Sequence, residues 1–210
     1  ADLSSEVRDE GRAAAAIRAQ YATDWNQWPA ADSAPFDDRN SNGTYEPSVD
    51  VPGFKGADQT IWFVCNDLDT ALTRRLYGTS PVGMEMQVTI WAYNRPGTLG
   101  NTLFKNYRLI NKSTVAFDSM WVTQAVDMDL GDSGDDFAGC DTTVGMAFGY
   151  NGGAIDNVYW GMVPPGLSFA ILNAPMTAAY YEGAGDPFGW PPFTFEGSWE
   201  WYNWMRGFIP

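Results

Sequence analysis

The chain has 210 residues, of which 45% are hydrophobic and 18% are charged, and its formal net charge is −14. This composition suits one folded domain with a sizeable core, while the shortage of Lys and Arg argues against nucleic acid and anionic membranes as partners. The sequence has no His, which excludes Ser-His-Asp catalysis and His-ligated zinc. No apolar run approaches the roughly 18 residues that cross a bilayer, so we expect no membrane insertion.

Residues 4–21 predict an N-terminal helix, because Ser4 or Ser5 can cap it and the alanines at 13–16 are strong helix formers. Its apolar edge is narrow and consists of Leu3, Val7, Ala14, Ile17 and Tyr21. We therefore expect an extension over 1–24 that docks either on its own domain or on another copy of the chain.

The stretch 25–56 is rich in Pro, Asp, Asn and Gly and too long for an ordinary connection, which predicts a functional or ion-organised loop. Beyond it, short apolar or alternating segments predict eight strands. They are 59–65, 84–93, 102–110, 117–126, 143–150, 157–163, 167–172 and 176–181. This spacing favours a mainly β fold, an antiparallel β-sandwich of jelly-roll or Ig-like form, as a single domain over 25–210. Residues 198–206 predict a short C-terminal helix.

The clearest local motif predicts a calcium-binding loop. It has oxygen-bearing side chains at positions 1, 3 and 5, Gly at position 6 and a main-chain carbonyl at position 7, like the first half of an EF-hand loop. These positions are Asp38, Asn40, Asn42, Gly43 and Thr44. Position 12 is Val49 and not Glu, which excludes a paired-helix EF-hand and leaves Glu46 or Asp50 to complete the ligands. The alternative is an Asn/Gly turn with solvated acids.

A second acidic segment, 127–141, holds six Asp in fifteen residues: Asp127, Asp129, Asp132, Asp135, Asp136 and Asp141. Like charges this close repel unless solvent or a cation screens them, and the glycines between them let the chain wrap an ion. The segment therefore predicts a second calcium site, with a solvated acidic loop as the alternative. Cys65 and Cys140 are a candidate disulfide in an oxidising compartment, or two buried thiols.

A carbohydrate-active domain is the rival interpretation. The chain holds ten Trp, ten Tyr and twelve Phe, and an exposed aromatic platform would stack on sugars, although aromatics mostly fill cores and interfaces. A glycosidase needs two carboxylates across a cleft, and no motif singles out such a pair.

Long strings in the sequence carry a family resemblance. Among them are WNQWP (25–29), APFDDRNSNGTYEP (34–47), PGFKGADQTIWFVCNDLD (52–69), YGTSPVGMEMQVTIWAYNR (77–95) and WYNWMRGF (201–208). Over about 25–210 the chain resembles an uncharacterised module of large secreted bacterial proteins that carry a type IX secretion sorting domain. The resemblance implies export to the cell surface, and it supplies no established activity. It also implies O-glycosylation at Asp-Ser/Thr-apolar triplets, with Ser33, Thr70, Ser119 and Thr142 as candidate acceptors.

Together these features predict a secreted, calcium-stabilised structural protein that is not an enzyme. We expect head-to-tail self-association into an extracellular filament, with Leu3, Val7, Ile17 and Tyr21 of one copy against Trp199, Trp201 and Trp204 of the next. Surface glycans are a further expected partner. The alternative function is a carbohydrate-binding module or a carboxylate-based glycoside hydrolase.

Overall fold

The computed structural model describes residues 11, 13–122, 124, 126, 129–174 and 202–203. Over these residues the chain is mainly β with antiparallel strands, which confirms the predicted class, and it divides into two compact units. Unit 1 comprises residues 1–69 and 81–114, and unit 2 comprises 70–80 and 115–210. The predicted jelly-roll or Ig-like sandwich stays a prediction.

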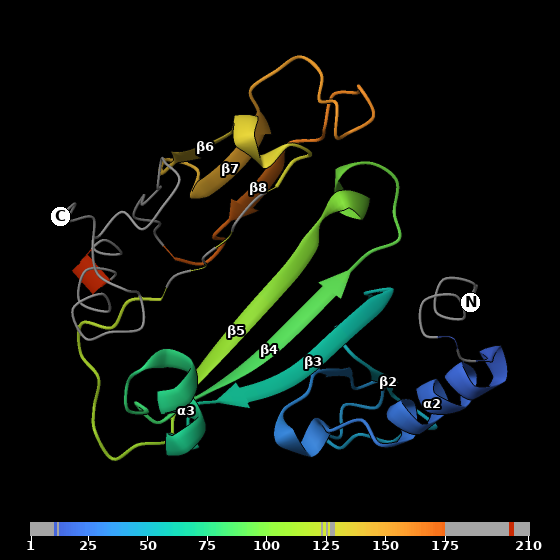
Figure 1. Ribbon diagram of the computed structural model, residues 1–210. Coiled ribbons are helices and arrows are strands. Elements are labelled where there is room, and N and C mark those ends of the chain that lie inside the picture. Colours follow the sequence, from blue (N-terminus) through green and yellow to red (C-terminus); the bar gives the residue numbers. More distant parts are fainter. Residues whose placement is uncertain are drawn as a thin grey trace. The chain divides into compact units, whose positions relative to one another are not determined.

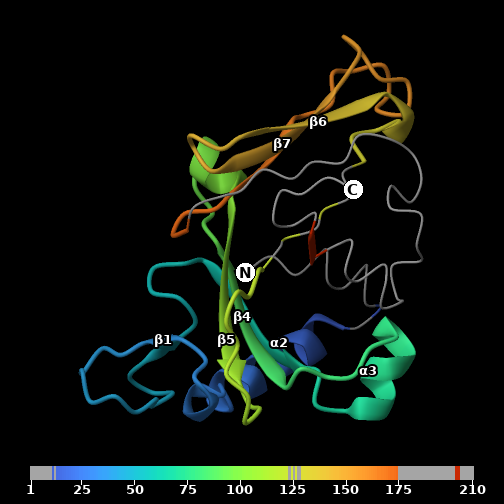
Figure 2. The same ribbon diagram turned by 90° about the vertical axis from the view of Figure 1, so that its left-hand side faces the viewer.

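Unit 1 is built on three long antiparallel strands in the order β3-β4-β5, which lie side by side in Figure 1. The described elements of unit 1 are α2 (Ala14–Asn26), η1 (Ala30–Asp32), β1 (Phe36–Asp37), β2 (Val51–Pro52), β3 (Gln59–Asn66), β4 (Met84–Ala92), η2 (Thr98–Asn101) and β5 (Leu103–Asn111). Strands β1 and β2 pair as a short antiparallel ribbon within the loop-rich segment that precedes β3. Figure 2 shows the sheet nearly edge-on, with the β1 loop on one side of it.

Helix α2 runs from Ala14 to Asn26, and its end lies five residues beyond the predicted end at Tyr21. Ile17 is buried and Tyr21 is about half exposed. The helix ends before Pro29, because the ring of a proline disfavours the helical conformation of the residue before it. Trp25 joins this end of the helix to the following loop, since its indole N–H donates to the carbonyl of Pro47 at 3.0 Å. The predicted residues 4–10 lie outside the described part of the chain.

The two faces of the β3–β4–β5 sheet differ. One, which we call the cavity face, carries Trp62, Val64, Glu85, Gln87 and Arg108 at alternating positions that the strand register places side by side. Near its end Trp91 stacks between Phe54 (4.1 Å between ring centroids) and Phe104 (5.4 Å). The aromatic contact with Phe54 shows that the segment before β3 folds over this face.

The opposite face, the apolar face, carries Ile61, Phe63, Val88, Leu103 and Tyr107. Val88 in the central strand is 2% exposed. Ile61, Phe63, Leu103 and Tyr107 on the outer strands are 41–67% exposed. The segment 59–65 forms the apolar strand that its sequence predicts, but Ile61 and Phe63 on this face of it are exposed.

Asp67 holds the junction between β3 and β4 together. Its carboxylate accepts the backbone N–H groups of Val82 (2.5 Å), Gly83 (3.2 Å) and Met84 (2.7 Å). The carboxylate therefore brings the start of β4 beside the end of β3, although helix α3 lies between them in the sequence. Gly83 has a φ of +80° and a Cβ there would lie 2.7 Å from Ser113, so glycine is required at this turn.

Unit 2 contains a second antiparallel sheet, of order β6-β7-β8. Its described elements are α3 (Thr70–Tyr77), η3 (Ser133–Asp135), β6 (Asp136–Asp141), β7 (Met146–Asn151) and β8 (Leu167–Ala170). An isolated bridge between Asp156 and Met162 closes a turn that follows β7. Residues 202–203 are helical, and the rest of the predicted helix at 198–206 lies outside the described residues.

Several predicted strands are confirmed, and others are not. The segments 59–65, 84–93, 102–110, 143–150 and 167–172 correspond to β3, β4, β5, β7 and β8. The prediction was wrong for 157–163, where the chain turns, and for the described part of 117–126, which forms no strand. In the turn, Asp156 accepts backbone N–H groups, which competes with strand pairing. The segment 176–181 lies outside the described residues.

Two elements were missed. Strand β6 lies inside the acidic segment, for which the sequence predicts a loop. The strand was missed because the Asp residues at its two ends belong to the run of acidic residues. Helix α3 has eight residues, too few for a clear helical periodicity. Among the described residues no helix has both the length and the apolar character needed to cross a membrane.

We expect Asp67→Ala to lower the free energy of unfolding by about 3 kcal/mol, because three backbone N–H groups lose a charged acceptor. Urea denaturation measures this change. Asp24→Ala is the matched control, since Asp24 is exposed on α2 and accepts one side-chain hydrogen bond. A loss for Asp67→Ala no larger than that of the control would contradict the role of Asp67 at the junction.

Candidate functional site

The predicted calcium loop is organised by the carboxylate of Asp38. Its Oδ1 accepts the backbone N–H of Asn42 at 3.2 Å, and its Oδ2 accepts that of Gly43 at 2.7 Å. Gly43 has a φ of +75°, which lets the chain reverse at this point. The amide oxygens of Asn40 and Asn42 each accept a backbone N–H two residues further on. The loop is therefore a series of local side-chain to backbone turns.

Glu46 closes this loop. Its Oε2 accepts the side-chain amides of Asn40 at 2.6 Å and of Asn42 at 2.8 Å. Asp38 and Asn40 both bond to the backbone N–H of Asn42, so the side chains at positions 1, 3, 5 and 9 of the motif gather in one place. The structure thus brings together four of the six predicted ligands of the first site.

Asp50, the other candidate for completing the ligands, is buried and bonds to the backbone of the loop. It is 2% exposed, and its two oxygens accept the backbone N–H groups of Arg39 at 3.0 Å and Glu46 at 2.8 Å. Its charge adds to the effect of burial, and together they raise the pKa of Tyr45. Asp50 therefore supports the loop from inside. The hydroxyl of Tyr45 donates to the carbonyl of Trp25 at 2.6 Å, which joins the loop to α2.

In unit 2 the acidic segment is gathered around Asp156, a residue that the sequence analysis did not select. Asp156 is 3% exposed and accepts the backbone N–H groups of Asp132 at 2.7 Å and Tyr159 at 2.8 Å. These hydrogen bonds lower its pKa. The pKa of Asp135 is raised by burial and by the charges of Asp156, Asp132 and Asp136. Four carboxylates are therefore close enough to interact electrostatically.

Two buried oxygens beside this group have no hydrogen-bond partner in the described structure: Asp136 Oδ1 and Asn151 Oδ1. The two residues are direct partners in the β6–β7 register. Asp136 Oδ2 accepts the backbone N–H of Leu130 at 2.7 Å, and the Asn151 amide donates to the carbonyl of Gly153 at 2.9 Å. The two unpartnered oxygens are unusual, because buried polar atoms normally have partners.

The other predicted residues of this segment do not join the group. Asp141 accepts the hydroxyl of Thr143 at 2.5 Å and its backbone N–H at 2.9 Å, and these bonds lower the pKa of Asp141. Asp129 is exposed, and Asp127 lies outside the described residues. No local motif in the sequence marks Asn151 or Asp156, because each joins the group through strand pairing or a turn far along the chain.

The side chains that gather in the two acidic regions offer oxygen atoms as potential metal ligands and no sulfur or imidazole nitrogen. Across the described ranges no three Cys, Asp or Glu side chains converge as they would around a metal ion. The 38–46 loop instead combines two carboxylates, Asp38 and Glu46, with the side-chain amides of Asn40 and Asn42. An all-oxygen set of this kind suits Ca²⁺ and is a poor match for zinc or copper, which prefer nitrogen and sulfur.

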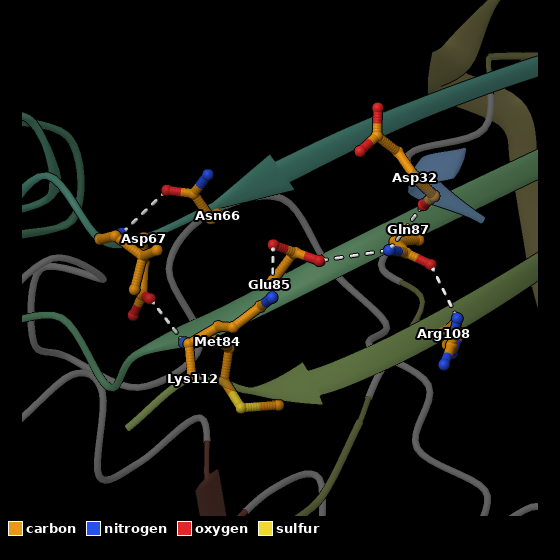
Figure 3. Close-up of polar contacts among 9 residues, drawn as sticks. Asp32, Asn66, Asp67, Met84, Glu85, Gln87, Arg108 and Lys112 are labelled. Atoms are coloured by element: carbon orange, nitrogen blue, oxygen red, sulfur yellow. Dashed lines mark hydrogen bonds and ion pairs between the residues drawn. The ribbon is translucent and has the colours of Figure 1, made fainter. Parts of the chain in front are cut away.

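A third feature is an open cavity of about 450 Å³ on the cavity face of the β3–β4–β5 sheet. Its lining consists of Asp32, Ser33, Trp62, Val64, Glu85, Gln87 and Lys112. Figure 3 shows the polar network beneath it. Lys112 Nζ lies 3.2 Å from Glu85 Oε2, and Gln87 Nε2 donates to Glu85 Oε1 at 3.2 Å. Of these lining residues, only Ser33 was predicted from the sequence to have a role, as a candidate glycosylation acceptor.

The remaining predicted residues are placed as follows. Cys65 is exposed in β3, Cys140 is half-buried in β6, and both are free thiols. The candidate glycosylation acceptors Ser33, Thr70, Ser119 and Thr142 are all exposed. The assembly residues Leu3, Val7, Trp199, Trp201 and Trp204 lie outside the described residues.

Comparisons with protein-family models, with curated proteins and with solved structures find no match to this chain. The resemblance to a secreted bacterial module therefore stays a prediction, and the functional argument rests on the sites themselves.

We expect Asp135→Asn to raise the melting temperature at pH 7 in EDTA, because the substitution removes a charge that burial and the carboxylates of Asp156, Asp132 and Asp136 disfavour. The folded pKa of Asp135 is raised, so its unfavourable contribution is present at neutral pH and disappears below its ordinary value of 3.8, where the carboxyl is protonated in both states. The advantage of the variant should fade over that range. Thermal unfolding from about pH 3 to about pH 8 measures it, because this range extends from below the ordinary pKa of a carboxyl to well above it.

Asp129→Asn is the matched control, since Asp129 is an exposed carboxylate of the same segment. A melting temperature that falls in Asp135→Asn, or a rise that is the same at all pH values, would show that the carboxylates do not repel one another in the folded state.

Proposed function

We propose that this chain is an extracellular structural domain that Ca²⁺ stabilises, with the 38–46 loop as its principal calcium site. The observation that carries the proposal is the position of Glu46. Its Oε2 is held at 2.6 Å and 2.8 Å by the amides of Asn40 and Asn42, so the last predicted ligand already lies beside the earlier ones. Oxygen ligands at motif positions 1, 3, 5, 7 and 9 are typical of calcium loops.

Asp38, Asn40, Asn42 and Glu46 would hold the ion together with the carbonyl of Thr44. The bound ion would neutralise the two carboxylates and cross-link the two ends of the loop. Each Asn now points its amide nitrogen at Glu46 and its oxygen at a backbone N–H. A turn of the amide group would exchange that backbone hydrogen bond for a bond between the oxygen and a cation. Asp50 keeps its two backbone hydrogen bonds in either state and so holds the loop ready for the ion.

The acidic group of unit 2 supports the same function. A cation beside Asp135, Asp136 and Asn151 would relieve the repulsion that raises the pKa of Asp135 and would give partners to the two unpartnered oxygens. A net charge of −14 disfavours a compact state through self-repulsion, and bound cations reduce that repulsion.

Self-association is part of the same proposal. The apolar side chains exposed on the outer strands β3 and β5 support it, because exposed apolar surface commonly marks an interaction site. Extracellular Ca²⁺ would also lower the charge repulsion between copies. On this proposal the chain has a structural role at the cell surface and performs no catalysis.

Terbium luminescence offers a direct test, because Trp25 and Tyr45 contact each other at the edge of the loop and can transfer excitation to Tb³⁺. We expect sensitised emission that Ca²⁺ displaces, and a melting temperature higher in millimolar Ca²⁺ than in EGTA. The double variant Asp38→Asn, Glu46→Gln should lose most of both effects. Asp118→Asn, an exposed position outside both acidic groups, is the matched control and should behave like the wild type.

A wild-type melting temperature that is the same in Ca²⁺ and in EGTA would overturn the proposed calcium function. A calcium response that the double variant retains would move the site away from the 38–46 loop.

Asp50→Asn distinguishes the supporting role of Asp50 from that of a ligand. We expect it to lower the free energy of unfolding by about 2 kcal/mol, because a buried charged acceptor of two N–H groups is weakened. The loss should be the same in Ca²⁺ and in EGTA, and the Tb³⁺ affinity should change little. If Asp50→Asn instead abolished Tb³⁺ emission in a folded protein, Asp50 would be a ligand.

A further inference from the structure

The cavity on the cavity face has the size of a small-molecule site, and its lining combines polar groups with two apolar side chains. Its volume of about 450 Å³ falls within the range of roughly 300–1,000 Å³ that ligand sites occupy. All of its lining residues belong to unit 1, and none belongs to the 38–46 loop. What binds here is therefore a separate question from what binds the acidic loops.

The polar groups at the floor of the cavity are held in place. Gln87 is 8% exposed, and its amide donates to Glu85 and to the carbonyl of Asp32 at 3.3 Å. The Gln87 carbonyl oxygen accepts from Arg108 at 3.2 Å. Glu85 is held in turn by Lys112. Figure 3 shows these side chains linked in a row across β4 and β5. Groups fixed in this way bind a ligand without a further loss of side-chain entropy.

The apolar part of the lining is formed by Trp62 and Val64 of β3. Trp62 is half-buried, and over the described residues its ring is part of no aromatic pair and its indole N–H has no hydrogen-bond partner. Trp91, on the same face, is stacked on both sides and has no free ring face. Trp62 therefore offers an aromatic surface and a hydrogen-bond donor together.

The charges of the lining decide which ligands fit. Among the described lining residues Lys112 is the one cation and is paired with Glu85, while Asp32 and Glu85 make the lining net negative, which disfavours a phosphate or a carboxylate. Asp32 adds an exposed carboxylate, which in Figure 3 points away from Gln87. A hydrophobic ligand would strip water from the exposed Asp32 carboxylate and from the Glu85–Lys112 pair without replacing it, which costs free energy. A neutral ligand with several hydroxyl groups and one apolar face fits the acceptors and the Trp62 ring at the same time.

We infer that this cavity binds a neutral saccharide of one or two sugar units. The C–H face of a pyranose ring packs on Trp62, and its hydroxyl groups bond to Asp32, Glu85 and Gln87. This inference does not depend on the proposed calcium function.

Saturation-transfer NMR on the full chain tests the inference with a defined panel: glucose, galactose, mannose, N-acetylglucosamine, maltose, cellobiose and lactose. At least one of these sugars should show transfer that titrates to saturation. Trp62→Ala should weaken its binding about tenfold, as expected for the central aromatic contact of a site. Trp160→Ala is the matched control, because Trp160 is 79% exposed in unit 2, and it should bind like the wild type.

Asp32→Ala keeps the test decisive should Trp62→Ala not fold, since the network uses the backbone carbonyl of Asp32 and not its side chain. We expect a melting temperature like that of the wild type and binding at least several-fold weaker. The sugars are tested up to about 10 mM, because a specific site of this size should bind more tightly than that. Absence of transfer for the whole panel at this concentration would overturn the inference. Binding that both folded variants retain unchanged would also overturn it. The calcium response of the protein is measured separately and decides neither outcome.

Discussion

Carboxylates that accept backbone N–H groups hold this chain together. Asp67 accepts three such groups, and Asp38, Asp50 and Asp156 accept two each. The chain has 26 acidic residues and only 12 basic ones, so few acids can find a cationic partner. Backbone N–H groups take that place, because hydrogen bonds to a charged acceptor are stronger than neutral ones. These hydrogen bonds fix the backbone conformation of long loops that contain no helix or strand.

The same constraint explains where cations would bind. A buried carboxylate that receives backbone N–H groups has little need for an ion, as Asp50 and Asp156 illustrate. Asp38 also receives two such groups, but it is only half-buried and its oxygens keep lone pairs for an ion. Glu46, Asp135 and Asp136 receive fewer such bonds, and their oxygens face amides, other carboxylates or no partner. Negative charge is left uncompensated at these places, and the two groups proposed to bind Ca²⁺ coincide with them. The proposed structural function therefore depends on which carboxylates accept backbone N–H groups and which keep an uncompensated charge.

The two faces of the β3–β4–β5 sheet differ in their side chains and in the roles proposed for them. One face combines the aromatic stack around Trp91 with a cavity over a fixed polar network. The other buries Val88 at its centre and leaves large apolar side chains exposed on the outer strands. Alternation along each strand makes this division possible, since neighbouring residues point to opposite sides. On the proposals made here, the first face receives a saccharide and the second takes part in association.

Local pattern in the sequence determined the strands β3, β4 and β5 and the gathering of Asp38, Asn40, Asn42 and Glu46. Both depend on residues a few positions apart, whose geometry the backbone sets. The jelly-roll or Ig-like form was not determined in this way, and strand β6 and helix α3 were missed. The junction at Asp67, the addition of Asp156 to the acidic group and the whole cavity were decided by tertiary structure. Glu85 and Lys112 meet because antiparallel pairing places β4 beside β5, and Asp32, from η1, joins them where Gln87 donates to its carbonyl. No local periodicity records which distant residues that register will bring together.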